Sequence, residues 1–325
     1  MIVERYRDED ASVWNAFERD SRNGTFQFDR GYMDYHRDRF VDHSMLMRSA
    51  EGELLALLPA HIVGETISSH NGLSFGGVIS GPRMTAPLFL RAFETLLLNL
   101  QQQGLHTVNY KTMPHIYHRQ PTDEDRYALY LIDAKLVRRD LLSVVFREDR
   151  LPYQSRRVRG IKKAQSAGVS VQQESDFSAF WSLLSESLAA RHGAEPIHIL
   201  EEMHSLRERF PANIQLHTSR SKSGELLGGV VVYISNRVAH AQYIASSAGG
   251  RDVGALDLLF DTLLNGLPDD VQYFDFGSSH EDAGRIVNQG LIEQKEGFGA
   301  RSVTFDRYLI DLTAIRPGVL TGALR

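Results

Sequence analysis

The sequence predicts an α+β protein of two similar domains in tandem, each a mixed, mostly antiparallel sheet flanked by helices. Three observations lead to this fold class. The chain has 325 residues, more than a single hydrophobic core usually serves. Hydrophobic residues make up 42% of it and charged residues 24%, as in ordinary globular proteins. The same order of helix, strands, helix and strand occurs once in each half.

In the first half, residues 10–20 have a helical pattern, and residues 52–64 indicate two strands. Residues 87–104 predict a helix that ends at a glycine, and residues 106–114 predict a strand that a proline stops.

The second half repeats this order with a helix at 176–191, three alternating strands at 214–247, a helix at 253–267 and a strand at 271–277. The similarity lies in the pattern and not in the residues. We therefore expect domains at 1–150 and 151–312, followed by a tail at 313–325 whose small residues, proline and glycine make a continued helix unfavourable.

Composition excludes several classes of function. The chain has no Cys, which excludes disulfide scaffolds, thiol catalysis and Cys-based zinc sites. Its net charge of −5 argues against a general DNA-binding protein, which would be basic. The first ten residues are charged, and the most apolar stretch, 86–100, is short and broken by Arg91 and Glu94. Neither a signal peptide nor a membrane span is expected, so we expect a cytoplasmic protein.

A basic run follows the expected domain boundary, with Arg156, Arg157, Arg159, Lys162 and Lys163 close together. One interpretation is a solvated helix face, as such runs usually are. The other is a patch that holds phosphates, since ligands often bind at domain junctions and Arg binds phosphate in a bidentate way.

The densest polar segment lies at residues 275–301. A predicted strand ends at Asp275 and Gly277, and ligands often bind at such strand ends. Lys295 and Phe298 follow within a glycine-rich segment, which lets a backbone approach a ligand closely. The competing interpretation is an ordinary connection whose lysine is an exposed loop residue.

Residues 290–300 (GLIEQKEGFGA) resemble the Fem-family signature, in which Gly-Leu precedes Phe-Lys-x-x-Phe-Gly; Lys295, Phe298 and Gly299 match it, and Gln294 replaces its first Phe. Residues 157–171 resemble the family's basic helix, and residues 273–277 its late strand. The stretches 111–130, 190–198, 209–218 and 240–247 resemble GNAT-type proteins associated with bacterial capsule or envelope polysaccharide gene sets. The motifs follow one another up to about Leu312.

This resemblance implies tandem GNAT-like domains, with Lys295 stabilising negative charge at an acyl-transfer site. It also implies that Arg157, Arg159 and Lys163 face an anionic substrate, and Lys111, Tyr117 and Asn288 complete the expected substrate set. For the general base we consider His198, His240 and Glu281, because histidine titrates near neutral pH. The resemblance favours His198.

The donor site is expected between a strand and a helix, where acetyl-CoA-dependent GNAT proteins have Arg/Gln-x-x-Gly-x-Gly/Ala and hold the pyrophosphate with backbone N–H groups. Arg251 and Gly254 match this pattern, whereas Leu256 does not and Asp252 adds a negative charge. The remaining expected donor residues are Gly249, Gly250, Phe298 and Gly299. Acetyl-CoA or another acyl-CoA is slightly favoured as donor over an aminoacyl-tRNA.

The first domain is expected either to hold the acceptor, near Lys111 and Tyr117, or only to support the second domain. No metal site is expected, because His115 and His118 have no carboxylate at helical spacing.

The favoured function is an N-acyltransferase that modifies an amino group of a nucleotide- or lipid-linked sugar in envelope polysaccharide biosynthesis. The amine would attack the donor directly, because Cys is absent and no Ser lies in a nucleophile-elbow pattern. The alternatives are a Fem-like aminoacyl-tRNA-dependent transferase and a non-catalytic binding protein on the same fold. Neither DNA binding nor membrane insertion is expected.

Overall fold

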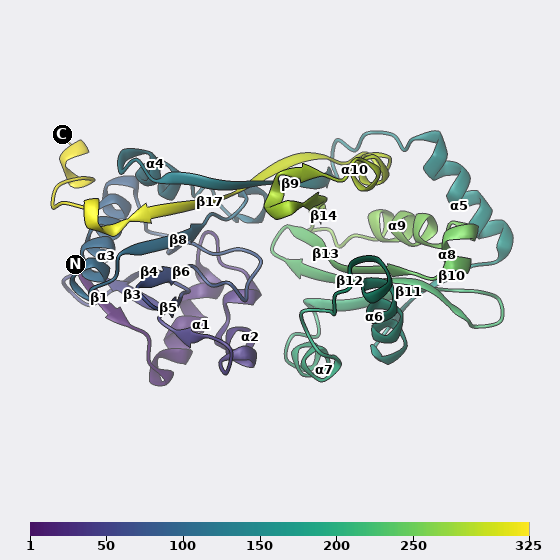
Figure 1. Ribbon diagram of the computed structural model, residues 1–325, viewed down its shortest axis with the longest axis horizontal. Helices are drawn as coiled ribbons and strands as arrows, with labels where there is room; N and C mark the ends of the chain where they lie inside the picture. Colours follow the sequence, from purple (N-terminus) through teal and green to yellow (C-terminus); the bar gives the residue numbers. More distant parts are fainter. Residues whose placement is uncertain (325) are drawn as a thin grey trace. The chain divides into compact units, whose positions relative to one another are not determined.

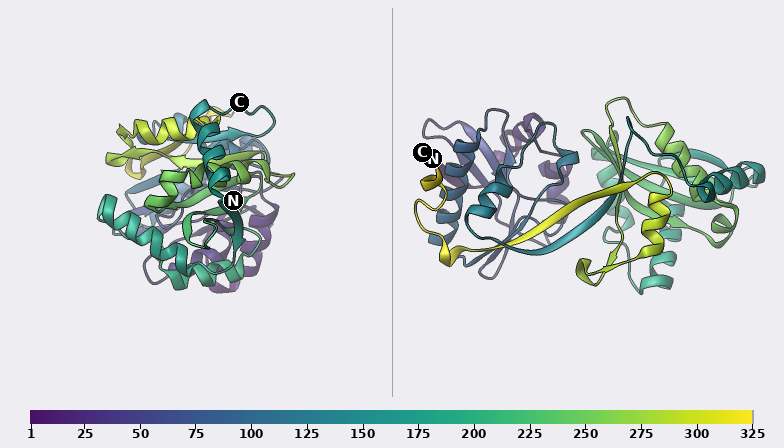
Figure 2. Two further views of the ribbon diagram at one scale, coloured as in Figure 1. Left: turned by 90° about the vertical axis from the view of Figure 1, so that its right-hand side faces the viewer. Right: turned by 90° about the horizontal axis from the view of Figure 1, so that it is seen from above.

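The computed structural model describes residues 1–324 and divides into two compact units (Figures 1 and 2). Unit 1 consists of Met1–Asp140 together with Thr304–Arg325, and unit 2 consists of Leu141–Val303. Residues 304–312, expected in the second domain, therefore belong to unit 1. Two long strands, β9 (Lys135–Phe146) and β17 (Arg301–Asp311), each contribute residues to both units.

Unit 1 contains an antiparallel sheet in the order β1-β3-β4-β7 (Ile2–Arg5, Met45–Arg48, Leu54–Leu58, Ile79–Ser80). A second run of strands has the order β17-β8-β6-β5-β2, with β8 at Thr107–Lys111, β6 at Thr66–Ser68, β5 at His61–Val63 and β2 at Val41–Asp42. The strands pair antiparallel except β6 and β8, which are parallel.

The helices of unit 1 are α1 (Ala11–Asp20), α2 (Arg30–Met33), α3 (Ala86–Gln102) and α4 (Glu124–Leu131). Helix α3 begins where the Thr85 hydroxyl accepts from the Leu88 N–H, and it buries an apolar face in the core of the unit. The predicted elements at 10–20, 52–64, 87–104 and 106–114 correspond to α1, β4 with β5, α3 and β8.

The C-terminal residues are held in unit 1 by hydrogen bonds to one carboxylate and by the burial of three apolar side chains. The Glu94 carboxylate accepts hydrogen bonds from the backbone N–H groups of residues 318, 320 and 321. Leu312, Ile315 and Leu320 are buried in the same core, against which Met1 and Leu324 also pack. Both chain ends therefore lie in unit 1 (Figures 1 and 2).

Unit 2 has one sheet in the order β10-β11-β12-β13-β14, continued by residues 141–146 of β9; the bounds are Ser170–Glu174, Ile214–Arg220, Leu226–Ser235, Val238–Ser246 and Tyr273–Ser278. Only β13 and β14 pair in parallel. The three strands predicted at 214–247 are β11, β12 and β13, and the strand predicted at 271–277 is β14.

Helices cover both faces of this sheet: α5 (Ser155–Ala167), α6 (Ser178–His192), α7 (Leu200–Arg209), α8 (Ala248–Val253), α9 (Ala255–Asn265) and α10 (Gln289–Glu296). On β12, a Cβ at Gly229 would meet Phe180 of α6, whereas the next residue, Val230, packs in the core with Leu259 of α9. Successive strand residues point to opposite faces, so α6 and α9 lie on opposite faces of the sheet (Figure 1).

Two short strands, β15 (His280–Glu281) and β16 (Ile286–Val287), form a hairpin before α10. Within residues 1–324, no helix is both long and apolar enough to cross a bilayer.

Candidate active site

The candidate site lies where two parallel strands of unit 2 meet. Strands β13 and β14 pair from Val238–Tyr273 to His240–Asp275, and β13 then continues to Ser246 along β12. This register places the side chains of His240 and Asp275 beside each other, although 35 residues separate them in sequence.

Asp275 orients His240. Its buried carboxylate lies 3.0 Å from His240 Nδ1 and accepts the Gly277 N–H at 2.7 Å. The His240 side chain is 16% exposed. A tautomer that donates Nδ1–H to Asp275 leaves the Nε2 lone pair available to accept a proton, which is the arrangement that a general base requires.

Lys295 joins the same site from the last turn of α10. Its Nζ donates to the carbonyl oxygens of Gly277 at 3.0 Å and Ser278 at 2.8 Å, at the end of β14. The side chain is buried, and burial lowers the pKa of Lys295 to about 8, opposed by the nearby Asp275 carboxylate. The competing interpretation of Lys295 as an exposed loop residue was therefore wrong, because residues 289–296 form a helix that turns Lys295 inward.

Phe298 and Gly299 fix the segment that follows Lys295. Phe298 is 0% exposed and packs on Phe260, Phe276 and Tyr153, so it is a core residue. Gly299 has φ +89°, and a Cβ there would lie 2.5 Å from the carbonyl oxygen of Leu151. Both residues were expected at the donor, and the structure gives them a packing role beside Lys295.

Asn288 and Glu281 lie at the beginning of α10. The Asn288 side chain caps the helix by accepting from Leu291 N–H at 3.1 Å and donates to Glu281 Oε1 at 2.9 Å. Glu281 is exposed in the β15–β16 hairpin.

His198 forms a second pair in unit 2. Its Nδ1 lies 2.5 Å from the Tyr243 hydroxyl, and the Tyr243 ring packs edge-on against Trp181. His198 is 4% exposed, so it lies in a buried aromatic environment, whereas His240 lies partly open beside a carboxylate. Of the three candidate bases, His240 has the carboxylate partner.

The basic run forms one face of α5, apart from Arg157. The Arg157 guanidinium is buried, pairs with Asp257 in the first turn of α9 and lies over the Phe298 ring at 5.6 Å. It therefore serves internal packing, while Arg159 and Lys163 are exposed.

The expected donor loop forms the short helix α8 and its junction with α9. Ser247 caps α8 by accepting from Gly250 N–H at 3.0 Å, and Arg251 donates to the Ser246 carbonyl at 2.7 Å. Gly254 has φ +78°, and a Cβ there would lie 2.6 Å from the Gly160 carbonyl of α5. Helix α5 therefore closes one side of this junction.

In unit 1, Lys111 and Tyr117 are buried. Lys111 Nζ donates to the His70 and Leu73 carbonyls at 3.0 and 2.7 Å, and burial lowers the pKa of Lys111 to about 7, helped by Arg307 and Arg138. Tyr117 packs on Phe75. Substrate binding by these residues stays a prediction.

Three buried histidines that the sequence did not single out as a group lie close to Lys111. The ring centroids of His36 and His61 lie 5.1 and 5.4 Å from that of His70, around Phe40. His36 Nε2, His61 Nε2 and His70 Nδ1 are buried without a hydrogen-bond partner. Burial lowers the pKa of His36 to about 4 and of His70 to about 2, so both rings are neutral at pH 7. Among the side chains that the structure describes, those of residues 1–190 and 193–324, no group of ligands is arranged to hold a metal ion.

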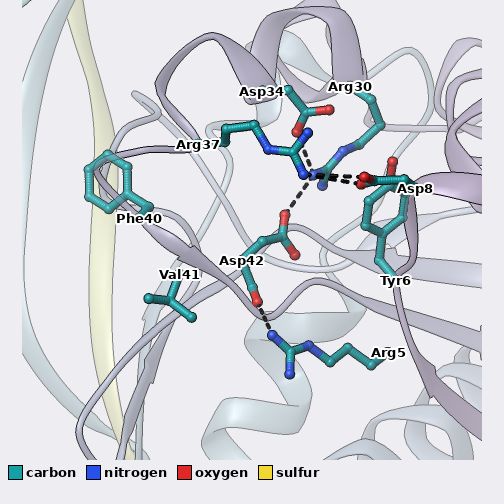
Figure 3. Close-up of a pocket in the computed structure, with 9 residues that line it drawn as sticks. All are labelled: Arg5, Tyr6, Asp8, Arg30, Asp34, Arg37, Phe40, Val41 and Asp42. Carbon is teal, nitrogen blue, oxygen red and sulfur yellow. Dashed lines mark hydrogen bonds and ion pairs between the residues drawn. The ribbon is translucent and has the colours of Figure 1, made fainter.

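Unit 1 also has a small surface pocket of about 230 Å³ (Figure 3). Its cations have internal partners: Arg30 pairs with Asp34 at 2.6 Å and Asp42 at 2.7 Å, and Arg37 pairs with Asp8 at 3.3 Å. These charges neutralise one another, so the residues that line the pocket form an ion-pair network around the turn after α2.

Part of unit 2 matches a known protein family. Residues 154–283, which contain β13, β14, His240 and Asp275, match the family model described as an acetyltransferase (GNAT) domain. No curated protein is significantly similar to the chain.

Solved structures match the chain over nearly all of its length. The crystal structure of FemX has a TM-score of 0.65 at 11% identity, over 94% of this chain and 97% of that one. The structure of L-PGS from Bacillus licheniformis has a TM-score of 0.59 at 12% identity, over 99% and 98%. A tandem GNAT protein from the clavulanic acid biosynthesis pathway has a TM-score of 0.51 at 11% identity, over 96% and 99%. At these identities the likeness shows the fold, and the predicted two GNAT-like domains are confirmed.

Proposed function

We propose that this chain is an N-acyltransferase whose active site contains His240, Asp275 and Lys295. The GNAT domain and the fold, which resembles those of FemX and of a tandem GNAT protein, support the proposal. The observation that carries the proposal is the hydrogen-bonded His240–Asp275 pair with Lys295 beside it. His240 Nε2 takes a proton from the acceptor amine, which attacks the donor carbonyl. A C–N bond forms, the C–S or C–O bond to the leaving group breaks, and His240 returns the proton to that group.

Lys295 stabilises the negative charge that develops on the carbonyl oxygen. A lysine ammonium has three N–H donors, and two go to the Gly277 and Ser278 carbonyls. The third is available for the oxyanion. A donor held in place before the reaction stabilises the transition state without reorganisation, which supports this role for a buried ammonium.

For the acyl donor we propose either acyl-CoA or an aminoacyl ester on tRNA, and two features of the structure around α9 favour the aminoacyl-tRNA. Pyrophosphate binding at α9 would need open backbone around Gly254, but Gly160 of α5 packs against that residue. The Asp257 carboxylate, paired with Arg157, also places negative charge in the first turn of α9. Both features disfavour a second anion at that helix end.

For the acceptor we propose an amino group on a nucleotide- or lipid-linked sugar. The reaction requires only an amine that can be deprotonated near neutral pH, and the resemblance to proteins of envelope polysaccharide gene sets suggests the sugar.

The test is an amide-formation assay with the purified full chain and a nucleotide-linked amino sugar. Acetyl-CoA is the donor in one arm and a mixture of aminoacylated tRNAs in the other, with products identified by mass spectrometry. We expect product in one arm and its loss in His240→Asn. Binding of a donor without turnover in either arm would instead identify a non-catalytic binding protein.

A further inference from the structure

The surface pocket of unit 1 is lined by opposite charges that are unevenly paired (Figure 3). The charged residues are three arginines and three aspartates: Arg5, Arg30, Arg37, Asp8, Asp34 and Asp42. Arg37 and Asp8 form one matched pair at 3.3 Å, and both of their side chains are more than half exposed. The other four charges divide into a region with an excess carboxylate and a region with an excess cation.

In the first region two carboxylates share one guanidinium. Arg30 pairs with Asp34 at 2.6 Å and with Asp42 at 2.7 Å. Arg30 is 4% exposed, and its guanidinium lies 3.8 Å from the centre of the Tyr6 ring, so its position is fixed. The side chains of Asp34 and Asp42 remain 27% and 30% exposed. A ligand ammonium can therefore approach two carboxylates that a single cation neutralises.

The second region is the Arg5 guanidinium. The Asp42 carboxylate faces Arg30, whereas the main-chain carbonyl of Asp42 accepts a hydrogen bond from Arg5 at 2.6 Å (Figure 3). Arg5 is exposed, and it forms no ion pair in the part of the chain whose side chains are described. A guanidinium has five N–H donors in a fork that matches a carboxylate. Arg5 therefore keeps donors for the carboxylate of a ligand.

The size of the pocket and its apolar wall limit the ligand further. Phe40 and Val41 also line the pocket, and Val41 is 62% exposed. The volume is about 230 Å³, below the range of about 300–1,000 Å³ for pockets that hold drug-sized ligands. A polyanion would meet the excess carboxylate, and a simple amine would leave Arg5 without a partner. A small molecule with an ammonium, a carboxylate and an apolar part matches all three regions.

We propose that this pocket binds a free α-amino acid with an apolar side chain. The ammonium lies against Asp34 and Asp42, and the carboxylate lies on Arg5. The side chain packs on Phe40 and Val41. The pocket contains none of the residues of the proposed transfer reaction, so this binding site is independent of that proposal.

Calorimetric titration of the full chain with L-leucine and L-valine tests the proposal. Two leucine analogues each lack one charge: isoamylamine has no carboxylate, and 4-methylpentanoate has no ammonium. The amino acids should bind, and each analogue should bind at least about tenfold more weakly than leucine, because a hydrogen bond to a charged group contributes about that factor.

The test variant Arg5→Gln should weaken the binding of leucine by a similar factor. Its matched control is Arg7→Gln, which removes an exposed cation from the same segment that does not line the pocket. Asp34→Asn, as a second variant, should weaken the binding of leucine but not of 4-methylpentanoate. Melting temperatures establish that each variant is folded.

Three results would overturn the proposal. The first is the absence of saturable binding for both amino acids. The second is binding of 4-methylpentanoate as tight as that of leucine, which would make the pocket a simple anion site. The third is an equal loss of leucine binding in Arg5→Gln and Arg7→Gln, which would mean that only the general charge of the segment matters.

Discussion

The Lys295 ammonium lies against two main-chain carbonyls and beside Asp275. This position predicts how replacing Lys295 changes turnover and how the rate depends on pH. Replacing it with Met keeps the length and removes the charge. The turnover number should fall by about two to three orders of magnitude, as for loss of one oxyanion donor. Since the pKa of Lys295 is about 8, the rate of the unsubstituted enzyme should fall as the pH rises through that value.

The measurement is kcat and KM between pH 6 and 9, with Lys135→Met as the exposed control. A loss confined to the apparent affinity for the donor would mean that Lys295 binds the donor and leaves the transition state to other groups. Normal values of both parameters would remove Lys295 from the site.

Asp275 should act through its two neighbours. In Asp275→Asn the tautomer of His240 is no longer fixed by a carboxylate, so turnover should fall by at least about a hundredfold, by analogy with loss of the orienting Asp in a catalytic triad. The carboxylate also raises the pKa of Lys295, so the alkaline fall in rate should move to lower pH. The pH profile checks this, because a purely structural role would lower the rate without moving the profile.

His70 should make unit 1 sensitive to acid. Its pKa is about 2 in the folded protein, below the ordinary 6.5, so the unfolded chain binds more protons below pH 6.5. Neutral, buried His70 therefore contributes fully to the free energy of unfolding above pH 6.5, and this contribution is lost as the pH falls towards 2. His70→Asn suits the positive φ of 48° and lacks the titration.

Urea unfolding at several pH values measures this effect. The stability difference between the unsubstituted protein and His70→Asn should shrink by up to about 1.4 kcal/mol per pH unit below 6.5. A difference that stays constant from pH 7 to 5 would contradict the assignment.

At the level of elements, the contact of α5 with α9 depends on Gly160. A Cβ there would lie 1.8 Å from an oxygen of the Asp257 carboxylate, which Arg157 holds in place. Gly160→Ala should therefore destabilise unit 2 by about 1–3 kcal/mol, the usual cost of overpacking. Gly249→Ala is the control, because the nearest atom to its Cβ would be 3.9 Å away. Equal melting temperatures for the two variants would mean that α5 shifts freely on α9.

The elements that the sequence predicted are those with strong local periodicity, such as α3, α9 and the three strands β11 to β13. Lys295 was also placed at the site by its motif. Local patterns could not predict which distant strands pair. The parallel register that brings His240 to Asp275 depends on the two helices, α8 and α9, that lie between β13 and β14. Tertiary packing also determines that Lys295 is buried and that Arg157 forms an ion pair with Asp257 instead of joining the exposed basic face.

For the whole molecule, the division into units predicts which fragments fold. Residues 141–303 contain every strand of the unit 2 sheet and should fold alone with a cooperative melting transition. Residues 1–150 should not, because they lack β17, which pairs with β8, and the residues that bind Glu94. Joining residues 1–140 to 304–325 through a flexible linker should restore folding. Circular dichroism of the three fragments checks this, and a cooperative transition in 1–150 would contradict it.

Residues 304–324 complete the core of unit 1, and this determines the order in which the two units fold on the ribosome. Unit 2 is finished before they are made, so the part of the chain translated first completes its fold last. At 5–20 residues per second, residues 141–303 take about 8–30 s to synthesise. Throughout that interval the nascent chain presents the unpaired edge of β8 and an apolar surface that awaits Leu312, Ile315 and Leu320. Such a surface is a natural target for chaperones that bind emerging polypeptides.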